Sequence, residues 1–491
     1  MTEHLPVLQV VVPLLAAPLC LVFRRAAFAH LFAVAVAWTC FAIAMTLLWQ
    51  VLGEGSISYE LGGWPPPIGI EYRVDVINAF VLVIVSAVTS AVLVIGPGVQ
   101  GHAIPTGREH LFYATFLLCL AGLLGVTITG DVFNVFVFLE ISSLAAYTLV
   151  SLGKSRRSLL AAFSYLVMGT IGGTFVLIGI GLMYLMTGTL NMADLAVRIP
   201  AVWDTRTIQA AFAFLSVGIS IKLAVFPLHQ WLPNAYTYAP PVVSAFLAAT
   251  ATKVAYYLLV RLIFTVFGAA FVFEALHLER LLLPLSIAAM FIGAIAAINQ
   301  TDLKRLLAYS SVSQVGYMTL GLAFGTITGL TGGIVHLLNH ALTKGGLFLV
   351  VACIVSQLGS TKIADLRGLG RRMPLTTAAF VVGGLGLIGV PATSGFVSKW
   401  YLVLAALERG SPLIALAILA SSLLAAVYVW RVIEVAYFQE PPADAPRREA
   451  TAWILIPTWI LIGASVYFGI FTDWSAGIAE IAAAQLLGIA P

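Results

Sequence analysis

The sequence has little charge. Asp, Glu, Lys and Arg make up only 9% of its 491 residues, whereas a soluble domain carries about 25%. Hydrophobic residues make up 61%, and apolar runs long enough to span a bilayer, roughly 20 residues each, recur from end to end. The alternating strands of a porin-like barrel are missing. We therefore expect an all-α polytopic membrane protein.

Other absences exclude kinds of chemistry. The four cysteines fall in apolar runs without metal-ligand spacing, which favours buried, inert thiols over a disulfide framework. We find no nucleotide-binding loop, haem motif or soluble domain, and so expect no cofactor, no metal and no redox centre. The net charge of +4 is dispersed, and no nucleic-acid partner is expected. The first residues lack a basic region and a small-residue cleavage site, so we expect no cleaved signal.

Fourteen membrane spans are predicted, with errors of several residues at their ends. They run over 5–23, 28–52, 74–97, 111–129, 131–151, 158–187, 207–238, 240–268, 279–299, 303–324, 327–357, 374–408, 411–438 and 451–471. Loops after odd-numbered spans hold fourteen Lys and Arg residues, and loops after even-numbered spans hold five. This bias places the odd loops in the cytoplasm and both termini outside. The 53–73 loop is either a short hairpin or a rigid connector.

Two spans are expected to break. The stretch from Lys222 to Phe246 places a lysine in an apolar run that four prolines interrupt, beginning with Pro227. Each proline removes an N–H and clashes with the carbonyl four residues back. The twelfth span has glycines around Pro391 and should break in the same way. Because the breaks lie five spans apart, and five is odd, the pattern predicts two inverted five-helix repeats.

This organisation divides the chain into four parts. They are the three N-terminal spans (1–110), a first inverted repeat of spans four to eight (111–270), a second of spans nine to thirteen (271–438), and the last span with a short tail (439–491).

Lysine is concentrated where it is least expected. A lysine at the centre of a membrane helix costs about 2.5–3.5 kcal/mol on insertion scales. Of the seven lysines, Lys154, Lys304 and Lys362 are assigned to cytoplasmic loops, whereas Lys222, Lys253, Lys344 and Lys399 fall inside predicted spans. The alternative to a functional role is that these side chains snorkel to an interface.

Glu140 lies in the middle of the fifth span. A buried carboxylate needs a cation or a proton, so Lys222 is its predicted partner. The pair is either switched by a passing proton or is a static structural contact. His229, near the first break, is a candidate relay or a cap of the broken helix. Thr250, in the eighth span, is a second candidate relay.

His336, His340 and Lys344 follow one another at spacings of four residues. This spacing drifts only about 40° per step, so the three side chains lie along one helix face. Imidazole titrates near neutrality, and the row therefore predicts a proton wire. A metal bound by the two histidines is the alternative, although no acidic or cysteine neighbour supports it.

Three further charged features have local interpretations. Asp131 is expected to cap the helix of the fifth span, with a role in ion entry as the alternative. Arg261 is expected to snorkel from the outer end of the eighth span. Arg431 and Glu434, three residues apart, are expected to form a local ion pair.

The breaks and the buried charges resemble the antiporter-like subunits shared by respiratory complex I, membrane-bound hydrogenases and Mrp-type Na⁺/H⁺ antiporters. The resemblance covers nearly the whole chain. It implies about fourteen helices in two inverted five-helix units, with broken seventh and twelfth helices. It also implies that protons move within the membrane plane along a buried axis, which here consists of Glu140, Lys222, Lys253, His336, His340, Lys344 and Lys399.

Within that family, Lys399 and the short tail resemble the D type of Mrp subunit. The resemblance implies a secondary ion transporter subunit rather than an enzyme, in the inner membrane of a bacterium or archaeon. Its partners would be H⁺, Na⁺ and Mrp subunits of the A, B, C, E, F and G types. The alternative is a proton-pumping subunit of complex I (NADH-quinone oxidoreductase) or of a membrane-bound hydrogenase. A third interpretation is a scaffold whose polar residues only hold helices together.

Overall fold

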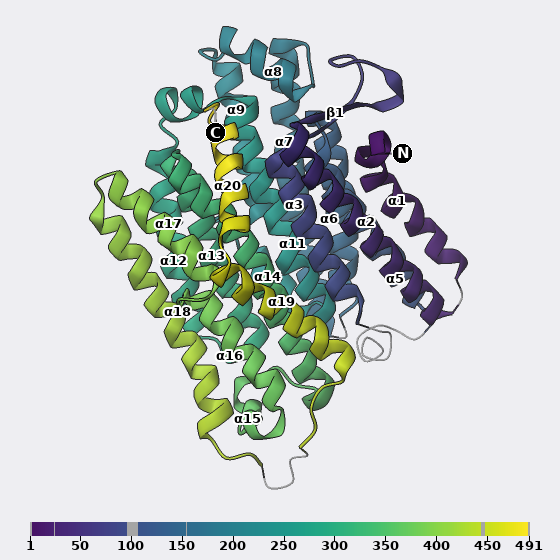
Figure 1. Ribbon diagram of the computed structural model, residues 1–491, viewed down its shortest axis with the longest axis vertical. Helices are drawn as coiled ribbons and strands as arrows, with labels where there is room; N and C mark the ends of the chain where they lie inside the picture. Colours follow the sequence, from purple (N-terminus) through teal and green to yellow (C-terminus); the bar gives the residue numbers. More distant parts are fainter. Residues whose placement is uncertain (1, 24, 96–106, 154, 443–446, 490–491) are drawn as a thin grey trace.

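The computed structural model describes residues 2–23, 25–95, 107–153, 155–442 and 447–489, which form a bundle of long helices (Figure 1). Arg24 and Lys154, which the loop charges include, lie outside these ranges, as do residues 96 and 97 of the third predicted span. Both chain ends lie in the upper half of Figure 1. Their placement on the outer side of a membrane stays a prediction.

The helices follow the predicted spans closely. The first are α1 (Leu5–Leu19), α2 (Ala26–Glu54), α3 (Val76–Leu93), α5 (Glu109–Ile128), α6 (Val132–Ser151), α7 (Arg156–Thr187) and α8 (Met192–Arg198). The next are α9 (Arg206–Leu223), α10 (Trp231–Tyr238), α11 (Pro241–Val260), α12 (Glu279–Ile298), α13 (Leu303–Phe324) and α14 (Ile327–Leu358). The last are α15 (Leu369–Arg372), α16 (Pro374–Ile388), α17 (Ser394–Glu408), α18 (Pro412–Phe438), α19 (Ala452–Ile470) and α20 (Asp473–Leu486).

Shorter helical turns connect these elements. They are Thr2–His4, Cys20–Val22, Leu61–Gly63, Ile199–Ala201, Arg261–Val266, Ala270–Ala275 and Ile363–Leu366. The two strands, β1 (Ile57–Glu60) and β2 (Glu71–Val74), pair antiparallel with Ile57 opposite Val74. The 53–73 loop therefore forms the hairpin.

Within the described ranges, twelve helices are long and apolar enough to cross a membrane. Helices satisfy their own backbone hydrogen bonds, which is what a segment in lipid requires. The two other predicted spans are α13 and the broken pair of α16 and α17. Each of the fourteen predicted spans thus coincides with a helix or a broken helix. The sequence did not predict α20, which packs against α3 and α14.

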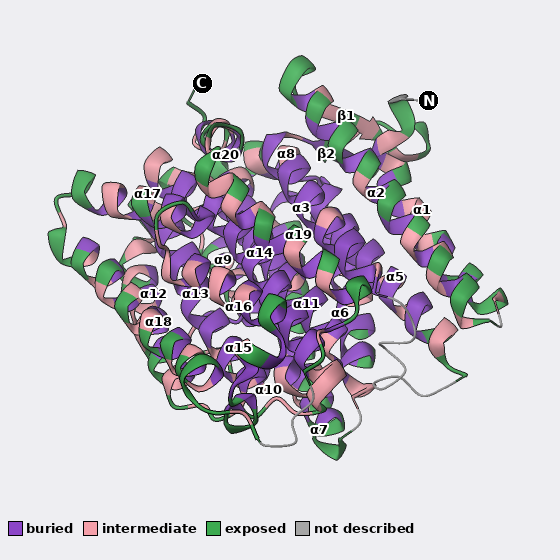
Figure 2. Cartoon of the chain, turned by 60° about the horizontal axis from the view of Figure 1, so that its bottom comes forward, coloured by how far each residue is buried: buried purple, intermediate pink, exposed green. Residues whose placement is uncertain are grey.

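The most buried helices lie at the centre of the bundle (Figure 2). The most hydrophobic windows of α3 and α11 are each 94% buried, against 33% for those of α18 and α19. α14 packs against α3, α11, α13, α16, α17, α19 and α20. Of the helices that carry candidate site residues, α11 and α14 are therefore largely surrounded by protein, whereas α6 and α9 are 56% and 50% buried. α18 and α19 present exposed apolar side chains.

α16 and α17 approach each other closely at Gly395. A Cβ there would lie 2.0 Å from the carbonyl oxygen of Gly386, which is backbone and cannot rotate away. Overpacking of this kind costs about 1–3 kcal/mol. We therefore expect Gly395→Ala to lower the thermal unfolding midpoint of the detergent-solubilised protein.

Gly463, in α19, supplies the matched control. A Cβ there meets no atom within 4 Å, and alanine in a helix stabilises by about 0.5–1 kcal/mol relative to glycine. Gly463→Ala should unfold at the wild-type temperature or slightly above it. Equal thermal unfolding midpoints for Gly395→Ala and Gly463→Ala would show that the close approach of α16 and α17 does not require glycine at position 395.

Candidate functional site

The seventh span breaks directly after Lys222. α9 ends at Leu223, and Ala224 adopts the left-handed conformation with φ of 61°. The indole N–H of Trp231, the first residue of α10, donates to the carbonyl oxygen of Ile221 at 2.8 Å. A backbone acceptor at the end of α9 is thereby satisfied across the break. The last turn of α9 holds Lys222 in the interior, where it is buried.

Three side chains of α6 surround the amine of Lys222. Its Nζ donates to Glu140 Oε1 at 3.1 Å, to Ser143 Oγ at 2.8 Å and to Tyr147 Oη at 3.4 Å. Residues three and seven positions apart on a helix share a face, so α6 presents all three acceptors together. The structure confirms Glu140 as the partner of Lys222.

Glycines of α7 make room for this arrangement. A Cβ at Gly173 would lie 2.3 Å from Glu140 Oε1, and one at Gly169 would lie 1.7 Å from the hydroxyl of Tyr147. The absence of side chains at both positions lets α7 pass close to the ion pair. Sequence reasoning did not single out these glycines, because their role depends on a neighbouring helix.

Lys253, on α11, is fully buried. Its Nζ donates to the carbonyl oxygen of Ala248 and, at 3.4 Å, to the hydroxyl of Thr252. In the described part of the chain, no carboxylate forms an ion pair with it. The hydroxyl of Thr250 donates to the carbonyl of Phe246 in its own helix at 2.7 Å. Thr250 is thus engaged with its helix, and its role as a relay stays a prediction.

α14 carries His336, His340 and Lys344, all fully buried. The two imidazole centroids lie 6.4 Å apart with nearly parallel rings. His336 Nδ1 contacts Ser398 Oγ at 2.8 Å, and Lys344 Nζ donates to the carbonyl oxygen of Leu307 at 2.7 Å. The amine also donates to the hydroxyl of Ser310. The spacing of four residues therefore places the two rings along the same face of α14, as predicted.

Several nitrogens in this row have no hydrogen-bond partner in the part of the chain that the structure describes. They are Nε2 of His336 and both ring nitrogens of His340. Buried polar groups are nearly always hydrogen-bonded, to protein or to ordered water. These ring nitrogens are therefore available to donate or accept a hydrogen bond within the row. Within the described ranges, no group of three or more His, Cys, Asp or Glu side chains is placed to hold a metal ion.

The twelfth span breaks between Ile388 and Ser394. Gly389 and Ala392 both have positive φ, 85° and 67°, and α17 begins at Ser394. Lys399 reaches back from α17 and donates to the carbonyl oxygens of Leu387 at 3.0 Å and Ile388 at 2.8 Å.

A hydroxyl and an aromatic ring complete the surroundings of this amine. Lys399 Nζ donates to Ser422 Oγ at 2.9 Å and lies 4.5 Å from the ring centroid of Tyr317. The two breaks thus hold their lysines differently. Lys222 precedes the first break and contacts a carboxylate. Lys399 follows the second break and contacts carbonyl oxygens that the break leaves free.

His229 lies in the segment between α9 and α10. Its ring stacks on that of Phe226, with centroids 5.4 Å apart, and its Nδ1 has no hydrogen-bond partner. Among the contacts of the described residues, none joins His229 to Lys222 or Lys253. The structure does not bring it into the site directly, and its role as a relay stays a prediction.

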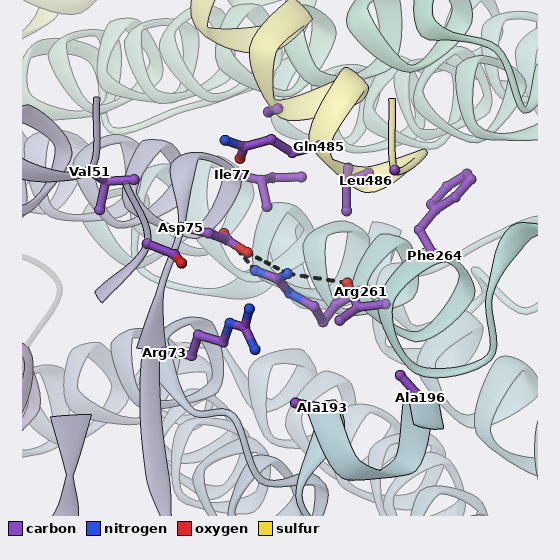
Figure 3. A pocket seen from close by; sticks show the side chains of 14 residues that line it. Val51, Arg73, Asp75, Ile77, Ala193, Ala196, Arg261, Phe264, Gln485 and Leu486 are labelled. Carbon is purple, nitrogen blue, oxygen red and sulfur yellow. Dashed lines mark hydrogen bonds and ion pairs between the residues drawn. The ribbon is translucent and has the colours of Figure 1, made fainter. Parts of the chain in front are cut away.

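Arg261 does not snorkel, and that prediction is wrong. It is buried, and its guanidinium contacts both carboxylate oxygens of Asp75, at 2.6 and 2.7 Å, on the wall of a cavity of about 560 Å³ (Figure 3). Burial alone would raise the pKa of Asp75, but Arg261 and the hydrogen bonds hold that pKa below its usual value. Because 186 residues separate the two, the sequence offers no local signal for the pair.

Asp131 caps α6, as predicted, by accepting a hydrogen bond from the backbone N–H of Asn134 at 2.7 Å. Burial raises the pKa of its carboxyl. The expected ion pair between Arg431 and Glu434 is absent from the described residues, where Glu434 is exposed. An exposed pair on a helix gains little from Coulomb attraction in water, so the two side chains need not meet.

Lys304 is not a loop residue, contrary to prediction. It lies in the first turn of α13, is buried, and donates to the carbonyl oxygen of Ala239 beyond the end of α10. The polar partners of the other lysines were also missed. They are Ser143, Tyr147, Ser310, Tyr317, Ser398 and Ser422. Serine and tyrosine are common in membrane helices, so only the helical spacing of Ser143 and Tyr147 from Glu140 offered a signal.

The site as a whole contains one ion pair and several amines without a counter-charge. Among the described residues, only Lys222 of the four lysines named for the spans forms an ion pair. Lys253, Lys344 and Lys399 contact carbonyl and hydroxyl oxygens instead. Such oxygens accept a hydrogen bond from an ammonium or from a neutral amine, so these sites can hold either protonation state.

The chain is similar to subunits of known membrane complexes. Residues 129–425 match the model of a family described as NADH:quinone oxidoreductase/Mrp antiporter, transmembrane. The chain is 44% identical over 491 residues to the N-type subunit of an NADH-quinone oxidoreductase from Desulforudis audaxviator, covering 96% of this chain and 97% of that one. It is 30% identical over 487 residues to the D-type subunit of an Na⁺/H⁺ antiporter from Bacillus subtilis, covering 98% and 97%. A chain of the Mrp complex from Dietzia sp. has a TM-score of 0.91 at 27% identity, over 99% of this chain and 97% of that chain.

Proposed function

Because the chain belongs to the NADH:quinone oxidoreductase/Mrp antiporter transmembrane family, we propose that it translocates protons as one subunit of a multisubunit membrane complex. It is a multi-pass protein of the cell membrane, and its partners are other hydrophobic subunits. The loop charges favour an orientation with both termini outside.

One observation carries this proposal. An ion pair between Lys222, which is buried, and Glu140, whose side chain is 24% exposed, lies at one end of a series of packed helices that hold buried titratable groups. α9 packs against α11, α11 packs against α14, and α14 packs against α17. These contacts favour an axis from the ion pair through Lys253 to the row on α14 and on to Lys399. Intramembrane ionisable residues in such a series usually mark an ion pathway.

The chemistry of a step follows from the contacts. A proton that arrives on Glu140 neutralises the carboxylate, so the ammonium of Lys222 loses its counter-charge. Lys222 can then release its proton through water to Lys253. Glu140 next transfers its proton to the neutral amine of Lys222, which restores the ion pair. The hydroxyls of Ser143 and Tyr147 hold the amine in place during this exchange. Because charges interact strongly where the dielectric is low, each protonation changes the next site.

The complex that we propose is an Mrp-type antiporter, in which inward proton flux drives Na⁺ outward. The D-type relative from an Na⁺/H⁺ antiporter, which matches 98% of this chain, supports this assignment. In it the chain is a secondary transporter subunit rather than an enzyme.

A second candidate is a proton-pumping subunit of a complex I-type oxidoreductase, in which electron transfer in other subunits drives the protons. The 44% identity to an N-type oxidoreductase subunit favours this candidate. Purification of the tagged chain from its native membrane, followed by identification of the copurifying subunits, separates the two. Small hydrophobic subunits alone would support the antiporter, and flavin or iron–sulfur subunits would support the oxidoreductase.

Replacing Lys344 by methionine tests the proposed axis. The change removes the amine but keeps an unbranched side chain, so its partners Leu307 and Ser310 stay in place. We expect proton transport in membrane vesicles to fall severalfold, with residual transport through water held by His340 and Ser310.

Arg409→Met is the matched control, because Arg409 is an exposed basic residue that lies outside the axis. Both variants should assemble at the wild-type level. Unchanged transport in an assembled Lys344→Met complex would contradict the role of Lys344.

A further inference from the structure

A second polar site lies outside the axis, where several helices end together. A cavity of about 610 Å³ is lined by the start of α7, the end of α10, the start of α13, the segment after α14 and the end of α18. Five basic side chains line it, and we refer to it as the basic cavity. They are Arg157, Arg305, Lys362, Arg367 and Arg431.

The charge of the basic cavity is not balanced from within. Within the described ranges, Asp302 is the one acidic residue in its lining. Its carboxylate already accepts hydrogen bonds from the backbone N–H of Arg305, at 3.1 Å, and from the hydroxyl of Thr361. Among the described residues, none of the five basic side chains forms an ion pair. Arg305 Nε is buried and has no hydrogen-bond partner.

Two helices add to the positive potential. α7 begins at Arg156 and α13 begins at Leu303, so Arg157 and Arg305 both lie in first turns. The N-terminal end of a helix carries a partial positive charge, which favours anions. The backbone N–H groups of Arg157 and Arg305 are already capped by Ser155 and Asp302, so the main attraction for a negative group comes from the basic side chains.

Arginine indicates which kind of anion fits. The guanidinium presents a planar fork that matches the oxygens of a phosphate and binds it with two parallel hydrogen bonds. Four of the five basic residues are arginines. A cavity of about 610 Å³ lies within the range of roughly 300–1,000 Å³ that holds an organic ligand, so a small inorganic ion would leave most of it empty.

Apolar surface lies beside the cavity. Gln300, just beyond the end of α12, and Arg431, near the end of α18, both line it. Ile295 on α12, with Val427 and Trp430 on α18, is exposed within two turns of those residues. α12 and α18 pack against each other, and an exposed Trp is typical of the membrane interface. The arrangement offers acyl chains a surface next to the charged groups.

We propose that the basic cavity binds the phosphate of an anionic phospholipid headgroup, whose acyl chains lie along α12 and α18. Basic pockets between membrane helices recognise such headgroups, and the loop charges predict that this end faces the cytoplasmic leaflet. The inference rests on neither the proton axis nor the choice of complex. A lipid bound in the basic cavity is a component of the subunit and holds together five chain segments that are distant in sequence.

The test is a lipid titration followed by native mass spectrometry. The detergent-solubilised protein, with its copurifying subunits, is titrated with cardiolipin and with phosphatidylcholine, in the presence and absence of inorganic phosphate. The double variant Arg305→Gln/Arg431→Gln should bind cardiolipin about 25-fold more weakly, because each basic side chain near an anionic lipid contributes roughly a factor of five. Binding of phosphatidylcholine should not change.

Two further variants keep the test decisive. Arg371→Gln removes an exposed charge at the same end of the protein but outside the cavity, and should bind cardiolipin as the wild type does. Arg305→Lys/Arg431→Lys keeps the charge and should retain most of the preference for cardiolipin even if the glutamine variant fails to fold. An equal loss in Arg371→Gln, or no preference for cardiolipin in the wild type and the lysine variant, would overturn the proposal. So would displacement of cardiolipin by free phosphate, or occupation of the cavity by an acidic segment of a crosslinked neighbouring subunit.

Discussion

Replacing Glu140 by glutamine is expected to reduce proton transport to the background of vesicles that lack the protein. The change leaves the shape of the side chain but removes the only carboxylate that pairs with Lys222 among the described residues. Glutamine cannot take up and release a proton, so the step in which Lys222 loses its counter-charge disappears. Transport is measured by the quenching of a pH-sensitive dye in inverted membrane vesicles.

Loss of transport must be separated from loss of structure. Removing one partner of a buried ion pair costs about 3–5 kcal/mol, because the other charge is left uncompensated, whereas removing both is often neutral. The double variant Glu140→Gln/Lys222→Met should therefore recover the assembly level of the wild type without recovering transport. Recovery of transport in the double variant would show that the pair is only structural.

Asp194→Asn is the matched control for the single variant. It also removes a carboxylate from an ion pair, the one with Arg198 at 3.0 Å, but the arginine is half-exposed. Exposed pairs contribute about 0–1 kcal/mol. This variant should transport protons at the wild-type rate, and a similar loss in both variants would point to a nonspecific effect of charge removal.

Asp75→Asn is expected to lower stability by about 3–5 kcal/mol, because it leaves the guanidinium of Arg261 buried without its partner. The effect should appear as a lower thermal unfolding midpoint in detergent. Asp131→Asn is the control, because Asp131 caps a helix in the same way as Asp75 but forms no ion pair among the described residues. A change at a cap alone costs at most about 1–2 kcal/mol.

The stabilisation by Asp75 should also depend on pH with a defined sign. Its pKa in the folded protein lies below the usual value, which is about 3.9. Its contribution is therefore fully present above pH 3.9 and is lost as the pH falls through the folded pKa. The difference in midpoint between wild type and Asp75→Asn should shrink on acidification. A constant difference down to pH 3 would contradict the ion pair as its source.

Much of the helix layout followed from local chemistry. Apolar runs of the right length defined the spans, and Pro227 and Pro391 located the breaks, because a proline acts on its own helix. The pair of Glu140 and Lys222 was also predictable, since a buried carboxylate requires a cation and few were available. Whether the two halves are inverted repeats stays a prediction.

The contacts that were missed depend on which helices become neighbours. Lys399 contacts the carbonyl oxygens of Leu387 and Ile388. These oxygens have no helical partner because the helix breaks there, and they lie near the amine because α17 folds back. Arg261 was expected to reach water because its partner Asp75 is far away in the sequence. Lys304 was assigned to a loop because its helix begins only one residue earlier, and a hydropathy boundary is not accurate enough to resolve that difference.

The unbroken helix α14 has an electrical consequence. It runs for 32 residues as one transmembrane span, with Lys344 eight residues after His336. At 1.5 Å per residue, a proton that passes between them travels roughly 12 Å along the helix axis, a large part of a hydrocarbon core about 30 Å thick. Moving one charge across the whole core is worth about 2.3 kcal/mol per 100 mV. In the proposed axis, a proton step along α14 would therefore sense the membrane voltage, whereas steps between helices at equal depth would not.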